Sequence, residues 1–184
     1  VLPELKGRDT SSLRAIPCGG SAVPKALSEG YREQTGLPIL QAWGMTETSP
    51  IGVISRLLPK HAALSDDERT KIKLKQGRGV WGVELKIVDE DGKPLPSDGQ
   101  AVGLLHVRGP WITSGYFHQE GGSVLDDEGY FPTADVATID ADGYVQLVDR
   151  AEDVIKSGGE WISSVELENA AVGCPGVAEA AAIG

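Results

Sequence analysis

Residues 13–48 read LRAIPCGGSAVPKALSEGYREQTGLPILQAWGMTET, and this stretch decides the fold class. A short apolar run at 13–17 meets the small-residue loop 18–22, and Pro24 then opens a helical pattern that reaches about Thr35. Proline suits the first turn of a helix, because the N–H that it lacks has no partner there in any case. The stretch therefore begins with a predicted strand, a tight loop and a helix.

A second apolar run at 37–43 follows the helix and leads into a second loop at 44–50. Strand, helix and strand together predict one α/β unit whose loops lie at the strand ends. Residues 60–75 then mix charged and small polar side chains. Within them, Ser65 and Glu68 either cap a short helix or belong to a solvent-facing connection.

The hydrophobic period changes beyond Gly77. Residues 83–88 alternate apolar and polar side chains as a half-buried strand does, and 89–93 supply a turn. Further strands are predicted at 103–108, 130–131, 136–139 and 144–148, with the turn signals Asp98-Gly99, Glu128-Gly129 and Asp142-Gly143 between them. This spacing is typical of a meander or a small barrel.

The pattern shifts again after Arg150, and we place a domain boundary at about 149–150. A strand at 154–156, a glycine turn and a helix from about Val165 to Val172 are predicted beyond it. Ser163 or Ser164 suits the capped start of that helix.

The chain is acidic, with a net charge of −10 over 184 residues. A sequence-independent nucleic-acid binder needs a basic surface, so nucleic acid is not expected as a partner. No apolar run approaches the roughly 18 residues of a membrane span and no signal peptide opens the chain, so we expect no membrane span and a cytoplasmic location. Cys18 and Cys174 form no CxxC pair, which indicates neither a disulfide framework nor a zinc site.

The two ends point to a longer polypeptide. The chain begins at Val1, and an apolar, strand-like run at 177–183 stops at Gly184 with nothing to turn it back. We therefore expect that these residues are an excerpt. Glycine (24) and proline (11) are abundant, which predicts many turns and loops.

The loops after the two predicted strands are the first candidates for chemistry. Their glycines let a backbone approach a ligand closely, and the hydroxyls of Thr46 and Thr48 can donate to phosphate oxygens. Glu47 is a hard oxygen ligand suited to Mg²⁺, and Trp43 offers a face on which a base can stack. The alternative is an ordinary turn, since two glycines after a strand are more often only that. Neither loop matches the Walker or the GxGxxG pattern.

Two further candidates lie downstream. Asp135 can accept from two ribose hydroxyls while Arg150 serves a hydroxyl or a phosphate, although a surface salt bridge or an Asx turn explains the same residues. Lys156 and Trp161 flank a glycine turn and can close over a bound nucleotide. An ordinary hairpin with an amphipathic Lys and a half-buried Trp is the alternative there.

The motifs taken together resemble the adenylate-forming enzymes, a superfamily that includes acyl-CoA synthetases, luciferases and the adenylation domains of peptide synthetases. The resemblance rests on four ordered stretches that cover nearly the whole chain, namely CGGSA (18–22), WGMTET (43–48), GYFPTAD (129–135) and DRAEDVIKSGGEWIS (149–163). The stretch KSGGEWISS (156–164) is most similar to medium- and long-chain fatty acyl-CoA synthetases.

The resemblance implies a mixed α/β and β fold, made of part of a large N-terminal domain and the start of a small C-terminal domain. Its segments would be an α/β part with adenine- and phosphate-facing loops at 1–76, a β-barrel-like part at 77–148, and the hinge with an incomplete C-terminal domain at 149–184. The activity implied is ATP-dependent: a fatty acid becomes acyl-AMP, and the acyl group passes to coenzyme A. A homodimer is compatible with the family.

The resemblance also implies roles for single residues. Thr46 would hold the α-phosphate side and Glu47 would ligate Mg²⁺, and both count with Lys156 as catalytic. The adenine pocket would be formed by Gly20, Gln41, Ala42 and Trp43.

The remaining roles fall on the second half of the chain. Asp135 would grip the ribose hydroxyls with help from Arg150, and the 149–150 segment would be the hinge. Lys156 and Trp161 would close over the nucleotide.

This chain departs from the family pattern at two positions. Ala134 stands where relatives carry glycine, and its Cβ would crowd the backbone if φ is positive there. Glu152 stands where relatives often carry lysine. The upstream phosphate loop and the C-terminal catalytic lysine of the family are not in these residues, so we expect no turnover from the chain alone. A non-catalytic nucleotide-binding relative and a peptide-synthetase-type adenylation domain remain the alternative functions.

Overall fold

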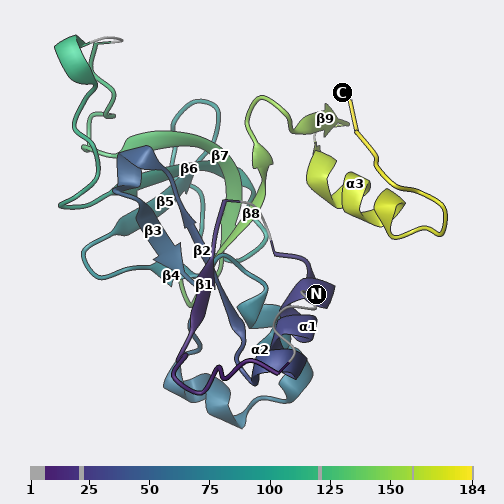
Figure 1. Cartoon of the computed structure of the whole chain (residues 1–184). Coiled ribbons are helices and arrows are strands. Elements are labelled where there is room, and N and C mark those ends of the chain that lie inside the picture. The colour runs from purple at the N-terminus through teal and green to yellow at the C-terminus, as the bar shows by residue number, and fades with distance from the viewer. Residues whose placement is uncertain (1–6, 21–22, 120–121, 159, 184) are drawn as a thin grey trace. The chain divides into compact units, whose positions relative to one another are not determined.

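The computed structural model describes residues 7–20, 23–119, 122–158 and 160–183. The chain divides into two compact units, Val1–Val83 and Glu84–Gly184, each with a four-stranded sheet (Figure 1). Ser21 and Ala22 of the first predicted loop and Gly159 of the predicted hairpin turn lie outside the described residues. The predicted limits of the three segments stay a prediction.

The sheet of the first unit has the order β1-β2-β3-β4. It is built from β1 (Ile16–Cys18), β2 (Ile39–Gly44), β3 (Ile51–Ile54) and β4 (Arg78–Gly79), with helix α1 (Lys25–Thr35) between the first two strands. β1 pairs parallel to β2, as strands joined by a helical crossover do, and the other pairs are antiparallel. The predicted α/β unit is confirmed.

Strand β1 is shorter than predicted at its start and longer at its end. The prediction of 13–17 was wrong at Leu13, which is exposed, because β2 begins at Ile39 and offers pairing partners only to Ile16–Cys18. Cys18 consequently ends the strand instead of opening the loop.

Local signals set both ends of helix α1. The sequence predicts Pro24 in the first turn, and the structure places it at the N-cap, one position earlier. Gly36 follows the helix with a left-handed φ of 74°, and its N–H donates to the carbonyl of Arg32. This is the usual glycine stop, in which a residue without a Cβ satisfies a terminal carbonyl.

The charged connection after β3 contains a capped helix. A 3-10 turn (Pro59–Ala63) precedes α2 (Asp66–Lys73). Ser65 Oγ accepts from the N–H of Glu68, and the Glu68 carboxylate accepts from the N–H of Ser65 at 2.9 Å. Of the two predicted alternatives, the capped helix is confirmed.

The sheet of the second unit is an antiparallel meander. Its strands are β5 (Glu84–Val88), β6 (Gly103–Arg108), β7 (Phe131–Ile139) and β8 (Val145–Arg150), and they pair in chain order. Side chains alternate between the two faces along each strand, and both faces are buried in places, since the consecutive residues Ile87 and Val88 are both fully buried. The fully buried residues of the sheet and its turns include Ile87, Val88, Leu105, Val107, Val136, Tyr144 and Val145. Each contributes about 1.5–3 kcal/mol on burial.

Strand β7 differs from the prediction. The two strands expected at 130–131 and 136–139 are one strand with shifted register, since 132–135 stay in the sheet as an irregular stretch. The turn-like Thr133–Asp135 sequence therefore forms a bulge rather than a loop. β8 likewise extends through Asp149 to Arg150.

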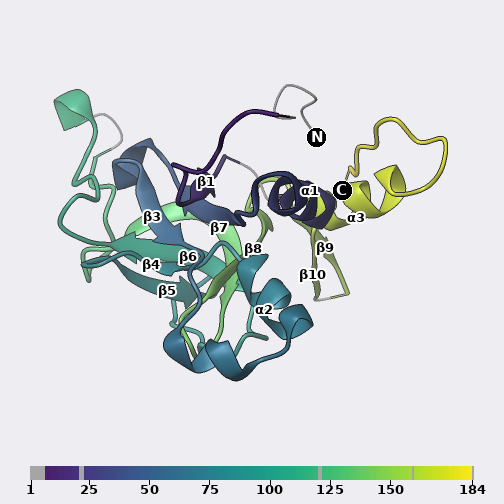
Figure 2. The same cartoon turned by 60° about the horizontal axis from the view of Figure 1, so that its bottom comes forward.

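The last elements are a two-stranded hairpin, β9 (Ile155–Ser157) with β10 (Glu160–Ile162), and helix α3 (Ser164–Val172) (Figure 2). The predicted strand and helix are both present, but β9 lies one residue later than the predicted 154–156, and Ser157 belongs to the strand rather than to the turn. The strand-like run at 177–183 was a wrong prediction: these residues form no strand, because no described strand pairs with them. None of the helices in the described ranges has the length and apolar character that crossing a bilayer requires.

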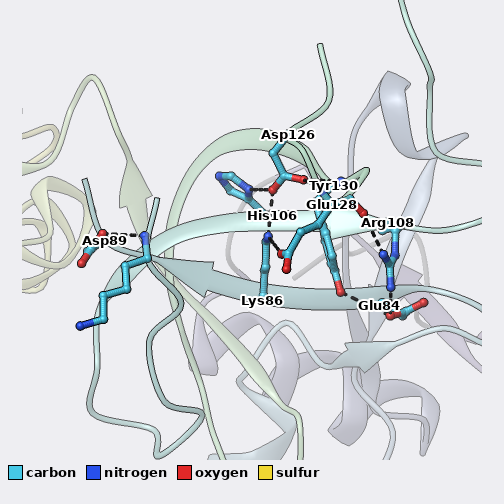
Figure 3. Close-up of polar contacts among 9 residues, drawn as sticks. Glu84, Lys86, Asp89, His106, Arg108, Asp126, Glu128 and Tyr130 are labelled. Atoms are coloured by element: carbon cyan, nitrogen blue, oxygen red, sulfur yellow. Dashed lines mark hydrogen bonds and ion pairs between the residues drawn. The ribbon is translucent and has the colours of Figure 1, made fainter. Parts of the chain in front are cut away.

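The outer face of β5 and β6 carries a charged network that the sequence analysis did not identify (Figure 3). Lys86 Nζ lies 2.9 Å from Asp126 and 2.5 Å from Glu128, and His106 Nδ1 lies 3.1 Å from Asp126. Tyr130 lies beside it, with its ring 4.3 Å from the Lys86 ammonium. The network ties the segment before β7 to the sheet.

Asp126 is the centre of this network. Partial burial acts to raise the pKa of Asp126, but hydrogen bonds from Lys86, from the backbone of Tyr130 and from His106 outweigh burial and hold that pKa well below its ordinary value. A carboxyl with a lowered pKa stabilises the fold at neutral pH, and this contribution is lost as the pH falls through the folded-state value.

We expect Asp126→Asn to lower the free energy of unfolding at pH 7 by about 1–2 kcal/mol, because Lys86 and His106 lose their shared acceptor. The difference in the free energy of unfolding between the natural protein and Asp126→Asn should shrink as the pH falls below the ordinary pKa range of carboxyl groups. The measurement is the thermal midpoint of the whole protein by circular dichroism across a pH series. Asp127→Asn, an adjacent exposed position with the same charge change, is the control, and an equal effect in both variants would contradict the assignment.

Candidate functional site

A cleft of about 220 Å³ opens at the ends of β1 and β2 in the first unit. The two strands are parallel neighbours, so the loops that follow them meet at one edge of the sheet. The lining comes from Pro17, Cys18, Gly19, Gly20, Ala42, Trp43, Gly44, Pro50 and Ile51. The first two predicted motifs therefore meet in one cleft.

Two glycines make this cleft possible. A Cβ on Gly19 would lie 2.8 Å from the carbonyl oxygen of Ala42, and one on Gly44 would lie 1.7 Å from the carbonyl oxygen of Pro50. Both spacings are below any normal van der Waals contact, so only glycine fits. At these two positions the cleft is lined by backbone without a side chain, so a flat or anionic ligand can approach closely.

Three of the four residues predicted for the adenine pocket line the cleft, and the fourth does not. Gly20, Ala42 and Trp43 are in the lining. Gln41 is buried; its side-chain amide donates to the Leu74 carbonyl at 2.7 Å, and its Oε1 accepts from the N–H of Val23. Through these two hydrogen bonds Gln41 ties three segments of the chain together instead.

Trp43 forms a packed wall of the cleft. Its side chain is only 7% exposed, and a Cβ on Gly52 would lie 2.5 Å from its ring. The indole is therefore held against the backbone of β3. This packing fixes the ring in place before any ligand arrives, which lowers the entropy that binding must remove.

The Thr-Glu turn follows directly, as the 3-10 turn Thr46–Thr48. Thr48 is fully buried: its hydroxyl accepts from the N–H of Met45 at 2.9 Å and donates to the Pro50 carbonyl at 2.6 Å. The prediction that Thr48 donates to phosphate was wrong, because its hydroxyl holds the turn together. Thr46 is exposed and Glu47 is half-buried.

Glu47 suits Mg²⁺ only in combination with a ligand. No group of three or more His, Cys, Asp or Glu side chains that could hold a metal ion occurs among the described residues. Mg²⁺ in nucleotide enzymes is commonly bound through one or two carboxylates, substrate phosphates and water. A single carboxylate beside an exposed threonine hydroxyl fits that arrangement.

In the second unit, the structure brings Asp135 and Arg150 together. They are directly opposite across β7 and β8, and Arg150 Nη1 donates to Asp135 Oδ1 at 2.9 Å. The Asp135 side chain is 8% exposed, whereas that of Arg150 is half exposed. Thr133 supports the bulge, since its hydroxyl donates to the Leu105 carbonyl and accepts from the N–H of Asp135.

Ala134 lies in the left-handed region, with φ of 59°. The sequence analysis singled this position out, because its relatives carry glycine there. The Ala134 side chain is exposed, and its carbonyl accepts from the N–H of Ala151 at 2.9 Å. The strain is therefore in the backbone and not in packing.

The hairpin brings Lys156 and Trp161 together as direct cross-strand partners, with the Lys156 ammonium 4.3 Å from the Trp161 ring. Lys156 also forms an ion pair with Glu90, a residue of the turn after β5. The sequence analysis missed Glu90, because nothing local links a turn acid to a lysine 66 residues away. Glu152, the second departure from the family pattern, is exposed.

These features define an α/β protein with a ligand cleft at the ends of its strands. Residues 2–117 match the family model described as "AMP-binding enzyme", so the chain belongs to that family, and the resemblance seen in the sequence is confirmed.

Similar proteins agree with this assignment. The chain is 50% identical over 179 residues to a 3-methylmercaptopropionyl-CoA ligase of Ruegeria pomeroyi, covering 97% of the chain and 33% of the relative. It is 48% identical to a medium-chain-fatty-acid–CoA ligase of Ectopseudomonas oleovorans, with 96% and 32% covered. The chain thus spans about a third of the length of these relatives.

Solved structures support the fold class. An amide bond synthetase from Marinactinospora thermotolerans superposes with a TM-score of 0.80 at 31% identity, covering 100% of this chain and 36% of the other. An anthranilate CoA ligase in complex with anthranoyl-AMP gives 0.76 at 32% identity, with 100% and 33% covered. The mixed α/β prediction is confirmed.

We expect Ala134→Gly to raise the free energy of unfolding. A left-handed φ costs alanine about 1–2 kcal/mol, and glycine relieves this cost. The greater freedom of glycine in the unfolded chain takes back about 0.5–1 kcal/mol. The net gain should be about 0.5–1 kcal/mol, measured by urea denaturation of the whole protein. Ala137→Gly in the same strand has no left-handed φ to relieve and should destabilise. A loss of stability in both variants would show that Ala134 is not strained.

Proposed function

We propose that this chain is part of an acyl-CoA synthetase that activates a fatty acid as acyl-AMP and then transfers the acyl group to coenzyme A. The observation that carries the proposal is the glycine-lined cleft with its Trp43 wall, followed at once by the Thr46–Glu47 turn. Two relatives, which are 48% and 50% identical to this chain, are named medium-chain-fatty-acid–CoA ligase and 3-methylmercaptopropionyl-CoA ligase, which supports the same class of reaction.

The residues would divide the work as follows. Gly20, Ala42 and Trp43 would receive the adenine, with Gln41 holding β2 from behind. Thr46 would donate to the α-phosphate. Asp135 would accept from the ribose hydroxyls, and its buried carboxylate is already oriented by Arg150.

The first half-reaction joins two anions. A carboxylate oxygen of the fatty acid attacks the α-phosphorus of ATP, and pyrophosphate leaves with its electron pair. Positive groups must offset the repulsion, and Arg150 and Lys156 are the candidates on this chain. Mg²⁺ held by Glu47 would supply further neutralisation of phosphate charge.

The second half-reaction forms the carbon–sulfur bond. The coenzyme A thiolate attacks the acyl carbonyl, and AMP leaves.

Two observations keep a non-catalytic relative as the competing candidate, namely the strained Ala134 beside Asp135 and the acidic Glu152. An adenylation domain that loads a carrier protein differs only in the thiol. A cytoplasmic location and a homodimer remain predictions.

The test is product analysis of the whole protein incubated with ATP, Mg²⁺, coenzyme A and fatty acids of graded chain length. We expect acyl-CoA and AMP in equal amounts by mass spectrometry, with one range of chain length preferred. Acyl-AMP without acyl-CoA would favour the carrier-protein alternative. Absence of both products, and of ATP–pyrophosphate exchange, would favour the non-catalytic one. The 184-residue chain alone should show no exchange, and turnover by it would contradict that expectation.

Glu47→Gln should lower the adenylation rate of the whole protein at least tenfold and raise the Mg²⁺ concentration needed for half-maximal rate, because a neutral amide is a poorer Mg²⁺ ligand. ATP–pyrophosphate exchange over a Mg²⁺ titration is the measurement. Glu33→Gln, an exposed position on α1 with the same change of charge, serves as the control. An unchanged Mg²⁺ dependence in Glu47→Gln would remove Glu47 from the metal site.

A further inference from the structure

The turn that joins β2 to β3 carries Thr46 and Glu47 (Figure 1). Thr48, the residue after them, is fully buried, whereas Thr46 is exposed and Glu47 is half-buried. Two side chains that a ligand can reach are therefore followed directly by one that it cannot. The contacts of that buried side chain decide how the turn is held.

Thr48 bonds to both backbone groups of Met45. The N–H of Met45 donates to the Thr48 hydroxyl at 2.9 Å, and the N–H of Thr48 donates to the Met45 carbonyl at 3.0 Å. Thr46 and Glu47 lie between these two residues, so a closed ring of hydrogen bonds spans them. The ring fixes the backbone from which both side chains project, so less conformational freedom remains to be lost when a ligand binds.

The same hydroxyl also reaches the lining of the cleft. It donates to the carbonyl of Pro50 at 2.6 Å, and that carbonyl packs so closely on Gly44 that a Cβ there would lie 1.7 Å from its oxygen. Pro50 and Gly44 both line the cleft. The Thr48 proton goes to Pro50 while an oxygen lone pair accepts from Met45, so one hydroxyl fixes the turn relative to the lining.

The turn needs this support because its backbone is strained at Ser49. The φ of Ser49 is 52°, in the left-handed region that a residue with a Cβ seldom adopts. Strained residues persist where the surrounding structure over-determines them. The bond from Thr48 to Pro50 spans Ser49 and so holds it in place. Thr48 has no exposed area, so solvent does not replace its hydroxyl when that group is removed.

We propose that Thr48 is a positioning residue, which holds Thr46 and Glu47 at a fixed place relative to the cleft so that the α-phosphate and the metal ion meet them in the geometry of the transition state. This inference rests on the proposed function for its ligand. Thr48 acts through the turn, because its hydroxyl is already engaged on both sides. The Trp43 wall is held separately, against β3. Loss of the Thr48 hydroxyl should therefore slow adenylation more than it weakens ATP binding.

The test compares variants of the whole protein in ATP–pyrophosphate exchange. Thr48→Val keeps the shape of the side chain but removes the hydroxyl. It should lower kcat about tenfold while the KM for ATP changes less than about twofold, because a small displacement of a reacting group slows the chemical step. The Mg²⁺ concentration for half-maximal rate should rise. Thr48→Ser keeps the hydroxyl and should restore most of kcat. An unchanged kcat in Thr48→Val, or an equal loss in Thr48→Ser, would overturn the proposal.

Thr35→Val is the matched control. The Thr35 hydroxyl also holds a turn, because it accepts from the N–H of Leu37 at 3.1 Å and donates to the carbonyl of Tyr31 at 2.7 Å. The same substitution there removes similar bonds from the end of α1, which carries none of the candidate site residues, so kcat and the Mg²⁺ dependence should match those of the natural protein. A loss of kcat as large as that in Thr48→Val would assign both losses to reduced stability and overturn the proposal.

A double-mutant cycle shows whether Thr48 acts through Glu47. In a Glu47→Gln background, Thr48→Val should lower kcat less than about threefold, since the metal ligand that Thr48 positions is already gone. A loss in that background as large as the one in the natural protein would overturn the proposal and assign Thr48 a general structural role.

A readout without turnover separates this inference from the proposed function. Amide hydrogen exchange in a peptide that covers residues 44–50, followed by mass spectrometry, should be faster in Thr48→Val than in the natural protein, because the Met45 N–H loses its acceptor. The same peptide should be unchanged in Thr35→Val. Failure of the natural protein to form acyl-AMP would refute the function, whereas equal exchange in Thr48→Val and the natural protein would refute the positioning role.

Discussion

The pairing of β7 with β8 is the constraint on which the second unit depends. It sets Asp135 opposite Arg150 and Val136 opposite Asp149, so one ladder of hydrogen bonds places the candidate ribose carboxylate, its guanidinium partner and the end of β8. The Asp135 side chain is almost fully buried, and the Arg150 guanidinium offsets part of the cost of burying its charge. The fold thus holds this carboxylate in one orientation, ready for hydroxyl donors. The bulge at Thr133–Asp135 turns the Asp135 carboxylate toward Arg150.

Strain and support are concentrated around that bulge. Ala134 holds a backbone conformation that favours glycine, and strained residues persist where the surrounding structure over-determines them. The surroundings here are well fixed: Thr133 bonds to β6 on one side, and Ala151 donates to the carbonyl of Ala134 on the other. Just before the same strand, the network centred on Asp126 anchors the entry to β7 (Figure 3). Two independent sets of contacts therefore fix the strand that carries Asp135.

Local signals in the sequence predicted most of the elements, and contacts between distant segments account for what it missed. Pro24 and the Ser65–Glu68 box act within one turn of chain, so the helices could be predicted. The bulge could not, because Thr133–Asp135 resembles a turn until β6 and β8 pair on either side. Gln41 was assigned to the ligand by residue type, but its partner Leu74 becomes a neighbour only in the fold. Thr48 was assigned in the same way, although its partners, Met45 and Pro50, are local and are brought to it by the conformation of the turn. The pairs Lys156–Glu90 and Asp149–Ser164 join residues 66 and 15 positions apart, beyond the reach of any local pattern.

The relative strengths of the contacts made by Asp149 and Lys156 decide which of them can change during a reaction. An exposed pair such as Lys156–Glu90 contributes about 0–1 kcal/mol, whereas each hydrogen bond to a buried carboxylate such as Asp149 contributes about 1.5–3 kcal/mol. A phosphate group carries more charge than Glu90 and offers several acceptor oxygens, so it can displace Glu90 from Lys156 at little cost. The contacts of Asp149 offer no such easy exchange. The contact of Lys156 with Glu90 is therefore the one that a ligand can replace most easily, whereas the contacts of Asp149 belong to the fold around the end of β8.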